Sequence, residues 1–528
     1  MPVKPVQPVV LKNLGSAGLN TQSPDSTLGP EFLTLADNVV FDYQGRIASR
    51  KGIKQVSKTV ANPIKSIAGY IKPNRTREYY LSSGSNIYKL DTSVTPYNLT
   101  VQSFSGTPQT ITNSDWQWVN FNDELWGVQN SHKVINFDGT SWYDIDDLGA
   151  YAAPSGITTF DPSCSLGNFG RMWYGGVTEA PGVVFYSDNL IGEKLTGGAA
   201  GVIDLKSVWG NDEIVGFSAI MNQLIIFGKQ NIVIYNNADD PNNLALDEVI
   251  RGVGLAGRDN ILYVGTDVLF LSYEGLMSIK RITTTDGKSP IEDLSFSVRN
   301  DLTRLLASAN VANIKSVYFQ EDGLVLTFIP DENKAYAFDF ALPSQAKLPR
   351  VTTWSFSSSP ICGLSTLDGK LFMGLSNSIA EYSDYYDVSL ALVGADWVAT
   401  NSNYTYTFQT SWLDLNLPQI SKIVKSGLFT ITGGRGATSE VSIFKDYEIG
   451  TPFTKSFTLS TTGTIYLYGK LNSLYGAAKY ASPEGPKEYK VSLGRTGKTI
   501  RIKMATEVNG NYSSLVNTML LTKQGKIR

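Results

Sequence analysis

The chain has 528 residues, of which 42% are hydrophobic and 18% are charged, and its formal net charge is −3. This length allows two to four domains, or one large repetitive domain with accessory parts. Sparse charges with 48 glycines and 27 tyrosines favour β structure, because surface helices need Glu and Lys for solubility. No apolar run approaches the roughly 18 residues of a membrane-spanning helix, and the first residues lack the apolar core of a secretory signal. We therefore expect a protein that is made in a cytoplasm and is used or assembled there.

Charge is unevenly distributed along the chain. Residues 401–528 contain 16 Lys and Arg against 7 Asp and Glu, whereas the first 400 residues contain 29 against 41. A basic C-terminal part and an acidic body indicate different surroundings for the two parts, unless solubility alone set both values.

The single histidine and the two cysteines limit the possible chemistry. Cys164 and Cys362 cannot form a disulfide framework or a four-thiolate zinc site, so both are predicted to be small buried hydrophobes. One histidine excludes multi-histidine metal sites, and the position of His132 in "QNSHKV" predicts a solvated turn residue rather than a catalytic base. We expect neither a metal nor a cofactor.

The N-terminal 60 residues show little periodicity. Residues 1–30 are rich in Pro, Ser and Gly, which predicts an extended arm that is ordered only against a partner. Residues 31–60 are predicted to form a hairpin that packs on one of the two larger units of the chain.

Residues 61–398 repeat one pattern, in which an apolar strand and a short turn lead to a second strand with an aromatic or apolar end. The clearest copy is "LIIFGKQNIVIY", Leu224 to Tyr235, with its turn at Gly228–Asn231. The residues that close the seven copies lie 42 to 61 positions apart; they are Tyr88, Phe137, Phe185, Tyr235, Met277, Phe338 and Tyr382. This period fits one four-stranded blade of a β-propeller. We predict an all-β fold with a seven-bladed propeller, or six blades if a terminal copy pairs elsewhere; the alternative is a series of unrelated hairpins from β-sandwiches.

One helix is expected within the repeats. The stretch "SPIEDLSFSVRNDLTRLLASANVANI", residues 289–314, places Val298, Leu302, Leu305 and Leu306 at helical spacing. It lies between two copies and explains the longest gap, so we expect it to cover the propeller face or to pack on a neighbour.

Residues 399–528 read as strands with strict alternation, separated by Gly, Ser and Pro, which predicts a β-sandwich of roughly six to eight strands. Six basic residues are placed on two adjoining strands there: Lys487, Lys490, Arg495, Lys498, Arg501 and Lys503. Arg501 and Lys503 alternate with Ile500 and Ile502, so one side of the sheet is basic. Lys498, Arg501 and Lys503 are the candidates for a basic interface or a DNA-facing row, because phosphates bind such rows by counterion release. The alternative is a solvated outer face.

Known catalytic motifs are absent from the sequence. The "GGRG" at Gly433–Gly436 lacks the strand-to-helix context and the Lys-Ser/Thr of a phosphate loop, and it predicts a hairpin turn. In "NFDGTSW", Gly139 follows Asp138 directly, which breaks the spacing of a sialidase Asp-box. Paired carboxylates of a propeller glycosidase stay open, because carboxylates are common in this chain. We expect no enzymatic activity.

The stretch from Gly18 to Gly52 resembles the opening of tail nozzle proteins, also called tail hub or DNA stabilisation proteins, of short-tailed bacteriophages. The shared pattern comprises Ala36, Asn38, Phe41, Gly45, Ile47, Arg50 and Gly52. The likeness continues through "FDGTSWYDI", "GRMWYGG", "PGVVFYSD", "LIIFGKQNIVIY" and "GVGLAGRDNILYVGTDVLFLSYEGLMSI". It covers most of the chain in order, although each motif is short.

The resemblance implies a virion structural protein with a β-propeller and an accessory β platform. Such a protein assembles in the bacterial host cytoplasm as a six-fold ring in the virion tail. Its partners are further copies of itself, the tail adaptor above, and tail fibre, tailspike or needle proteins around or below. The ring continues the channel for double-stranded DNA and retains the packaged genome until ejection.

The charge distribution agrees with a channel wall, because like charge keeps DNA from sticking to an acidic body. Under this hypothesis, neutralising Lys498, Arg501 and Lys503 together weakens ring assembly or genome retention. Two other functions are considered: a receptor- or glycan-binding propeller on the same tail, and a depolymerase that acts on surface polysaccharide.

Overall fold

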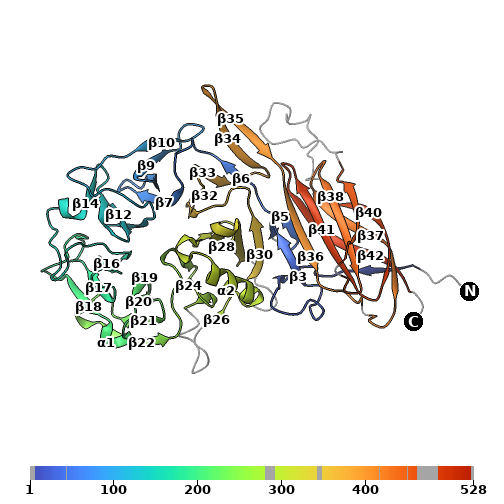
Figure 1. The fold of residues 1–528 in the computed structure, drawn as a ribbon, viewed down its shortest axis with the longest axis horizontal. Coiled ribbons are helices and arrows are strands. Elements are labelled where there is room, and N and C mark those ends of the chain that lie inside the picture. Colours follow the sequence, from blue (N-terminus) through green and yellow to red (C-terminus); the bar gives the residue numbers. More distant parts are fainter. Residues whose placement is uncertain are drawn as a thin grey trace, which may run out of the picture.

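The computed structural model describes residues 6–42, 44–279, 292–341, 348–415, 417–448, 450–460 and 486–524. Strands dominate these residues, and they form two parts that lie side by side, a ring of small sheets and a pair of larger sheets (Figure 1). We call these parts the body and the sandwich.

The body contains seven four-stranded antiparallel units among the described residues, and we call each unit a blade. The first strands of blades 1 to 7 are β7 (Ile64–Ile71), β11 (Gln117–Phe121), β15 (Cys164–Asn168), β19 (Ile214–Ile220), β23 (Ile261–Val264), β27 (Lys315–Phe319) and β31 (Cys362–Ser365). The second strands are β8 (Arg77–Ser83), β12 (Glu124–Gln129), β16 (Arg171–Gly175), β20 (Gln223–Gly228), β24 (Asp267–Ser272), β28 (Leu324–Ile329) and β32 (Leu371–Gly374).

The third strands are β9 (Asn86–Asp91), β13 (His132–Phe137), β17 (Val183–Tyr186), β21 (Asn231–Asn236), β25 (Gly275–Ser278), β29 (Lys334–Asp339) and β33 (Ile379–Tyr382). The fourth strands of blades 1 to 6 are β10 (Asn98–Val101), β14 (Trp142–Asp144), β18 (Gly201–Asp204), β22 (Ala245–Arg251), β26 (Glu292–Asp293) and β30 (Arg350–Ser355). Blade 7 takes its fourth strand, β6 (Ile53–Gln55), from the N-terminal part of the chain.

The blades close into a ring. β7 contacts β11, β11 contacts β15, β15 contacts β19, and β19 contacts β24 of blade 5. The ring continues from β23 to β27 and β31, and β31 contacts β7 again. This is the arrangement of a β-propeller-like fold.

The repeat period corresponds to the blades. Each of the seven predicted closing residues, from Tyr88 to Tyr382, lies in the third strand of one blade. The strands of "LIIFGKQNIVIY" are buried along most of their length, because neighbouring blades cover both faces of the sheet. The predicted helix is present as α2 (Arg299–Ser308), which buries Leu302 and Leu306 and contacts β25 of blade 5.

The sandwich encloses an apolar core between two sheets. One sheet contains β1 (Gln7–Val10), β4 (Val39–Phe41), β5 (Ile47–Ser49), β37 (Lys422–Gly433), β40 (Lys487–Gly497) and β42 (Ser513–Gln524). The facing strands are β36 (Tyr404–Thr410), β38 (Thr438–Lys445), β39 (Phe453–Thr458) and β41 (Ile500–Val508). Phe429 and Ile431 of the first sheet share one core with Ile502 and Met504 of the second.

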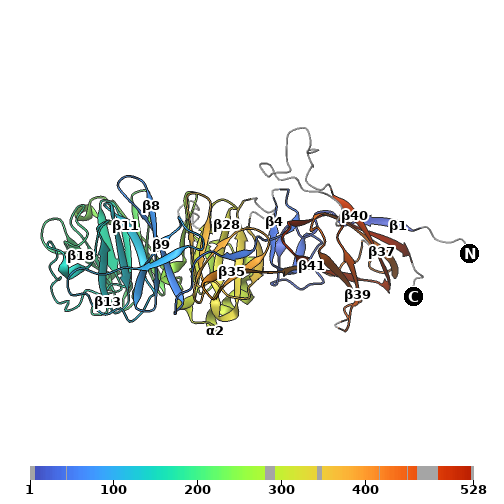
Figure 2. The same ribbon diagram turned by 90° about the horizontal axis from the view of Figure 1, so that it is seen from above.

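The N-terminal segment joins the two parts and does not form a separate arm, whereas β4 and β5 within residues 31–60 form a hairpin that packs in the sandwich. Strand β3 (Phe32–Asp37) pairs with β30 of blade 6 on one side and with β36 of the sandwich on the other, so one sheet runs through both parts (Figure 1). In Figure 2, β4 lies between the body and the sandwich. β4 and β5 enter the other sandwich sheet, and β6 closes blade 7. Upstream, β1 pairs with β42, and β2 (Gly18–Leu19) pairs with β3.

The predicted boundary at residue 399 falls inside a hairpin. Strands β34 (Asp387–Val393) and β35 (Asp396–Ser402) form this hairpin between the body and the sandwich, and the sandwich strands resume at Tyr404. The predicted turn at Gly433–Gly436 joins β37 and β38. Residues 461–485 of the predicted sandwich lie outside the described residues.

The close packing of the N-terminal segment at Gly52 predicts that a substitution there lowers the stability of the protein strongly. A Cβ atom at this position would lie 1.9 Å from the backbone oxygen of Tyr386, so Gly52→Ala requires the backbone to move. We expect Gly52→Ala to destabilise the protein by about 2–3 kcal/mol, measured as a lower midpoint of thermal or denaturant unfolding. Gly149→Ala is the matched control, because nothing lies within 4 Å of a Cβ there; equal midpoints for the two variants would contradict the prediction.

Candidate functional site

Two residues of the Ala36–Gly52 pattern, Asn38 and Arg50, lie where the body meets the sandwich. Asn38 has a positive φ of 56°, which Asn tolerates better than most residues. Its side-chain nitrogen donates to Ser355 Oγ (3.0 Å) on β30 and to the carbonyl oxygen of Thr405 (2.9 Å) on β36. Asn38 thus bonds to both parts of the molecule. We call the contact region around Asn38 and Arg50 the joint.

Arg50 is the central cation of the joint, and its side chain is completely buried. Its Nε donates to Asn38 Oδ1 (2.8 Å), and Nη2 donates to the carbonyl oxygen of Ser355 (3.3 Å). Nη1 lies 3.4 Å from Asp387 Oδ1 at the base of the β34–β35 hairpin. The guanidinium carbon lies 4.3 Å from the ring centroid of Tyr404 on β36. One side chain therefore contacts the N-terminal segment, blade 6, the hairpin and the sandwich.

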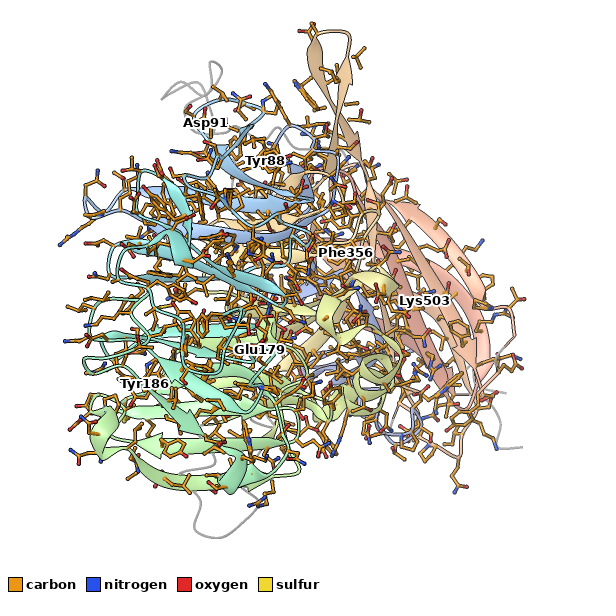
Figure 3. All side chains as sticks on the ribbon, turned by 60° about the vertical axis from the view of Figure 1, so that its left-hand side comes forward. Tyr88, Asp91, Glu179, Tyr186, Phe356 and Lys503 are labelled. Carbon is orange, nitrogen blue, oxygen red and sulfur yellow. The ribbon has the colours of Figure 1, made fainter. Side chains whose placement is uncertain are left out.

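The three candidate residues of the basic row do not form one row. Arg501 and Lys503 are half-buried on one side of β41, while Ile500 and Ile502 are buried on the other, as the alternation predicted. Lys498 lies in the turn between β40 and β41, and its backbone NH donates to Asp446 Oδ1. Lys503 is seen on the sandwich in Figure 3.

The placement of the six basic residues on adjoining strands is wrong. β40 pairs with β37 in one sheet, whereas β41 pairs with β36 and β38 in the other. Arg501 also has partners within its own chain: it forms an ion pair with Asp25, and its guanidinium lies 4.4 Å from the ring centroid of Trp412.

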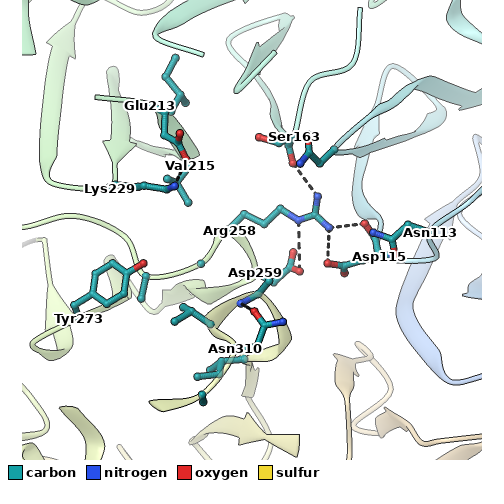
Figure 4. A pocket seen from close by; sticks show the side chains of 18 residues that line it. Asn113, Asp115, Ser163, Glu213, Val215, Lys229, Arg258, Asp259, Tyr273 and Asn310 are labelled. Carbon is teal, nitrogen blue, oxygen red and sulfur yellow. Dashed lines mark hydrogen bonds and ion pairs between the residues drawn. The ribbon is translucent and has the colours of Figure 1, made fainter. Parts of the chain in front are cut away.

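A second charged cluster, which sequence reasoning missed, lies on the axis of the body, and Figure 4 shows Arg258 of this cluster between Asp115 and Asp259. Lys315 forms ion pairs with Asp115 and with Asp259 (2.9 Å), and Arg258 lies 3.2 Å from Asp115 and 3.6 Å from Asp259. We call these four residues the axial network. Each lies at or just before the start of a blade's first strand, so the ring topology brings together residues that are far apart in sequence.

The surroundings of Asp259 and Lys315 favour the charged form of each. Burial disfavours ionised Asp259, but Lys315 and Arg258 outweigh this effect and lower the pKa of Asp259. Burial likewise opposes charge on Lys315, yet Asp259 and Asp115 raise its pKa. Two cations and two carboxylates therefore lie together in a partly buried site.

Two cavities adjoin the axial network. One has a volume of about 550 Å³ and is lined by Asn113, Asn310 and Tyr273, among others. The other has a volume of about 310 Å³ and is lined by Trp116 and Tyr263, among others. Arg258 and Asp259 line both cavities, so the network lies between them. Because Asp259 has a lowered pKa, it is unsuited to the role of general acid near neutral pH.

The cysteines agree with the sequence prediction, but the histidine does not. Cys164 and Cys362 are buried, and burial raises the pKa of each thiol to about 12. His132 is only 2% exposed. Its ring nitrogens lie 2.8 Å from the carbonyl oxygen of Lys133 and 3.2 Å from that of Gln109. The expectation of a solvated turn residue is wrong, because the segment around Gln109 covers this turn.

Across the part of the chain that the structure describes, no group of three or more His, Cys, Asp or Glu side chains is placed to hold a metal ion. Within the same residues, every helix is too short or too polar to traverse a bilayer.

No protein-family model matches the chain, and no curated protein sequence matches it. Among solved structures, the chain is similar to the extracellular domain of the hybrid two-component system BT4673 from B. thetaiotaomicron, with 10% identity and a TM-score of 0.40 over 68% of this chain and 44% of that one. It is similar to the Pan2 WD40 domain of Neurospora crassa, with 8% identity and a TM-score of 0.39 over 63% of this chain and 96% of that one.

A third similar structure is PorZ, a surface component of the type-IX secretion system of Porphyromonas gingivalis, with 12% identity and a TM-score of 0.36 over 69% of this chain and 42% of that one. The chain spans less than half the length of BT4673 and PorZ in these matches.

The axial network predicts a large difference between two lysines of the body, Lys315 and Lys229. Lys315→Met removes a buried cation between two partly buried carboxylates, so we expect a loss of about 3 kcal/mol of stability. Lys229→Met is the matched control, because the Lys229–Glu213 pair is about half exposed (53% and 46%) and is worth at most about 1 kcal/mol. Denaturant unfolding of both variants measures the difference, and similar losses would show that the network does not stabilise the ring.

Proposed function

We propose that this chain is the subunit of a tail nozzle, a structural protein in the virion tail of a short-tailed bacteriophage. In this proposal the body is a seven-bladed β-propeller and the sandwich is its platform. Copies form a six-fold ring below the tail adaptor and next to fibre, tailspike or needle proteins. The ring continues the path of double-stranded DNA, retains the packaged genome and conducts it at ejection.

The observation that carries the proposal is the role that residues of the Ala36–Gly52 pattern, which resembles tail nozzle proteins, have in this fold. Asn38 and Arg50 are held by hydrogen bonds across the joint, and Phe41 lies under the guanidinium of Arg350 at 4.4 Å. Gly52 has no room for a side chain. These contacts make a rigid connection between the two parts, which is what a subunit of a load-bearing ring needs.

The charges of the chain support a path for DNA between copies. The axis of the body holds a closed ionic network and cavities of a size suited to small molecules. A duplex therefore passes along the outer surfaces of the bodies, and their acidic charge keeps it from adhering.

A glycan-binding tail propeller is the second candidate. The larger axial cavity favours it, because that cavity is lined by the amides of Asn113, Asn130 and Asn310 and by Tyr273, which is 45% exposed. Amides and an exposed aromatic ring are groups that bind sugars.

Electron microscopy of the purified protein, alone and mixed with the tail adaptor of the same virion, tests the proposal. We expect six-fold rings with a central opening in at least one of the two samples. Separate monomers without rings in both samples would contradict the nozzle function. Release of reducing sugar from host capsule would contradict it as well, and would establish a depolymerase.

A further inference from the structure

The β34–β35 hairpin projects from the molecule near the joint (Figures 1 and 3). Its two strands pair along their whole length, from Asp387↔Ser402 to Val393↔Asp396. Apart from its partner strand, the one element with which it shares substantial contacts among the described residues is β6. A two-stranded hairpin is marginally stable alone in water, so an exposed hairpin of this length gains stability from a further surface.

One face of the hairpin is apolar. The pairs Leu390↔Ala399 and Leu392↔Trp397 are directly opposite each other, so these four side chains share one side. Leu392 is 57% exposed, and Val393 and Val398 on the other side are 62% and 45% exposed. A cluster of exposed apolar side chains marks an interaction surface.

The base of the hairpin is fixed. Asp387 Oδ1 accepts hydrogen bonds from the backbone NH of Ile53 (2.9 Å) and from Arg50 (3.4 Å). The backbone NH of Leu390 donates to Gln55 Oε1 (2.9 Å). The hairpin is therefore presented in one direction before any partner arrives, which lowers the entropy cost of binding.

The charges of the hairpin exclude an anionic partner. The sequence contains no Lys or Arg between Lys370 and Lys422, and the exposed tip carries Asp396. Nucleic acids, anionic polysaccharides and acidic lipid surfaces require basic residues at the contact. The fitting partner is an apolar surface with a basic rim.

The same chain carries such a surface on the outer side of the β1–β42–β37–β40 sheet. Val10, Met519 and Leu428 lie side by side across three strands, and Lys490 continues this row on β40. Leu521 lies in the next row, next to Pro8. Val10 is 43% exposed, and Leu428, Met519 and Leu521 are partly exposed. Lys425 and Lys490 are exposed and outnumber Glu488, the acidic residue beside Lys490 on the same face, so the rim of the stripe is predominantly basic. We call this surface the apolar stripe.

We propose that the β34–β35 hairpin of one copy docks on the apolar stripe of the next copy. The hairpin supplies an apolar face with an acidic tip, and the stripe supplies an apolar row with a basic rim. Because the two surfaces lie on different faces of one chain, the contact is heterologous and repeats from copy to copy. This inference deepens the proposed ring-forming function, rests on it, and identifies the two surfaces that build the ring.

Cross-linking in mixed samples tests the contact directly. Leu392→Cys and Val10→Cys proteins are combined in equal amounts and treated with a short bismaleimide. The native Cys164 and Cys362 are buried, so the introduced thiols react. We expect a cross-linked dimer in the mixture but not in either protein alone, because each contact needs one cysteine from each variant. Met221→Cys is the matched control for the hairpin cysteine, because Met221 is 95% exposed and lies outside both surfaces; its mixture with Val10→Cys should give no dimer.

A second measurement uses assembly itself. We expect Leu392→Asp with Trp397→Asp to abolish ring formation while the unfolding midpoint is unchanged, and we expect Met221→Asp to assemble like the wild type. Rings that form without the Leu392–Val10 cross-link would overturn the docking contact and leave the nozzle function standing. A wild-type protein that forms no assembly with or without the adaptor would overturn both.

Discussion

The buried guanidinium of Arg50 is the contact on which the two-part architecture depends. It bonds to Asn38 and Asp387 and lies against Tyr404, so it connects the N-terminal segment, the hairpin and the sandwich. A buried cation is costly unless its donors are satisfied, and here its partners come from segments more than 300 positions apart in sequence. The joint can therefore form only when the body and the sandwich are both in place.

This constraint gives the N-terminal segment a structural role that its composition does not suggest. Strand β3 links two sheets into one. The last blade closes the ring by pairing its third strand, β33, with β6, which precedes the first blade in the sequence. A ring closed by a strand from the opposite end of its sequence has no free edge at that point. The rigidity that results agrees with the proposed role as building material in a virion, and with a hairpin held in one direction for a neighbouring copy.

The sequence predicted the blades well because their periodicity is local. Tyr88, Phe185 and Tyr382 recur at the same strand of each blade because each copy must bury the same positions against its neighbours. Closure by Lys54 pairing with Glu381 was not predictable, since no local pattern states which distant strand a short segment joins. The alternation of Arg501 and Lys503 with buried isoleucines was likewise visible.

Other features depended on tertiary context. Strands β40 and β41 are consecutive but belong to opposite sheets, because a sandwich distributes neighbouring strands between its layers. The axial network combines Asp115, Arg258 and Lys315 from three blades, and each residue alone looks like an ordinary surface charge. His132 looked solvated because its covering residue, Gln109, is 23 positions away.

Calorimetry of the wild type and of Arg50→Met tests the central claim that the joint makes one unit of the body and the sandwich. Methionine is apolar and cannot replace the five donors of the guanidinium. The account predicts one cooperative transition for the wild type and two separated transitions for Arg50→Met. Two transitions in the wild type, or a single unchanged transition in the variant, would contradict it.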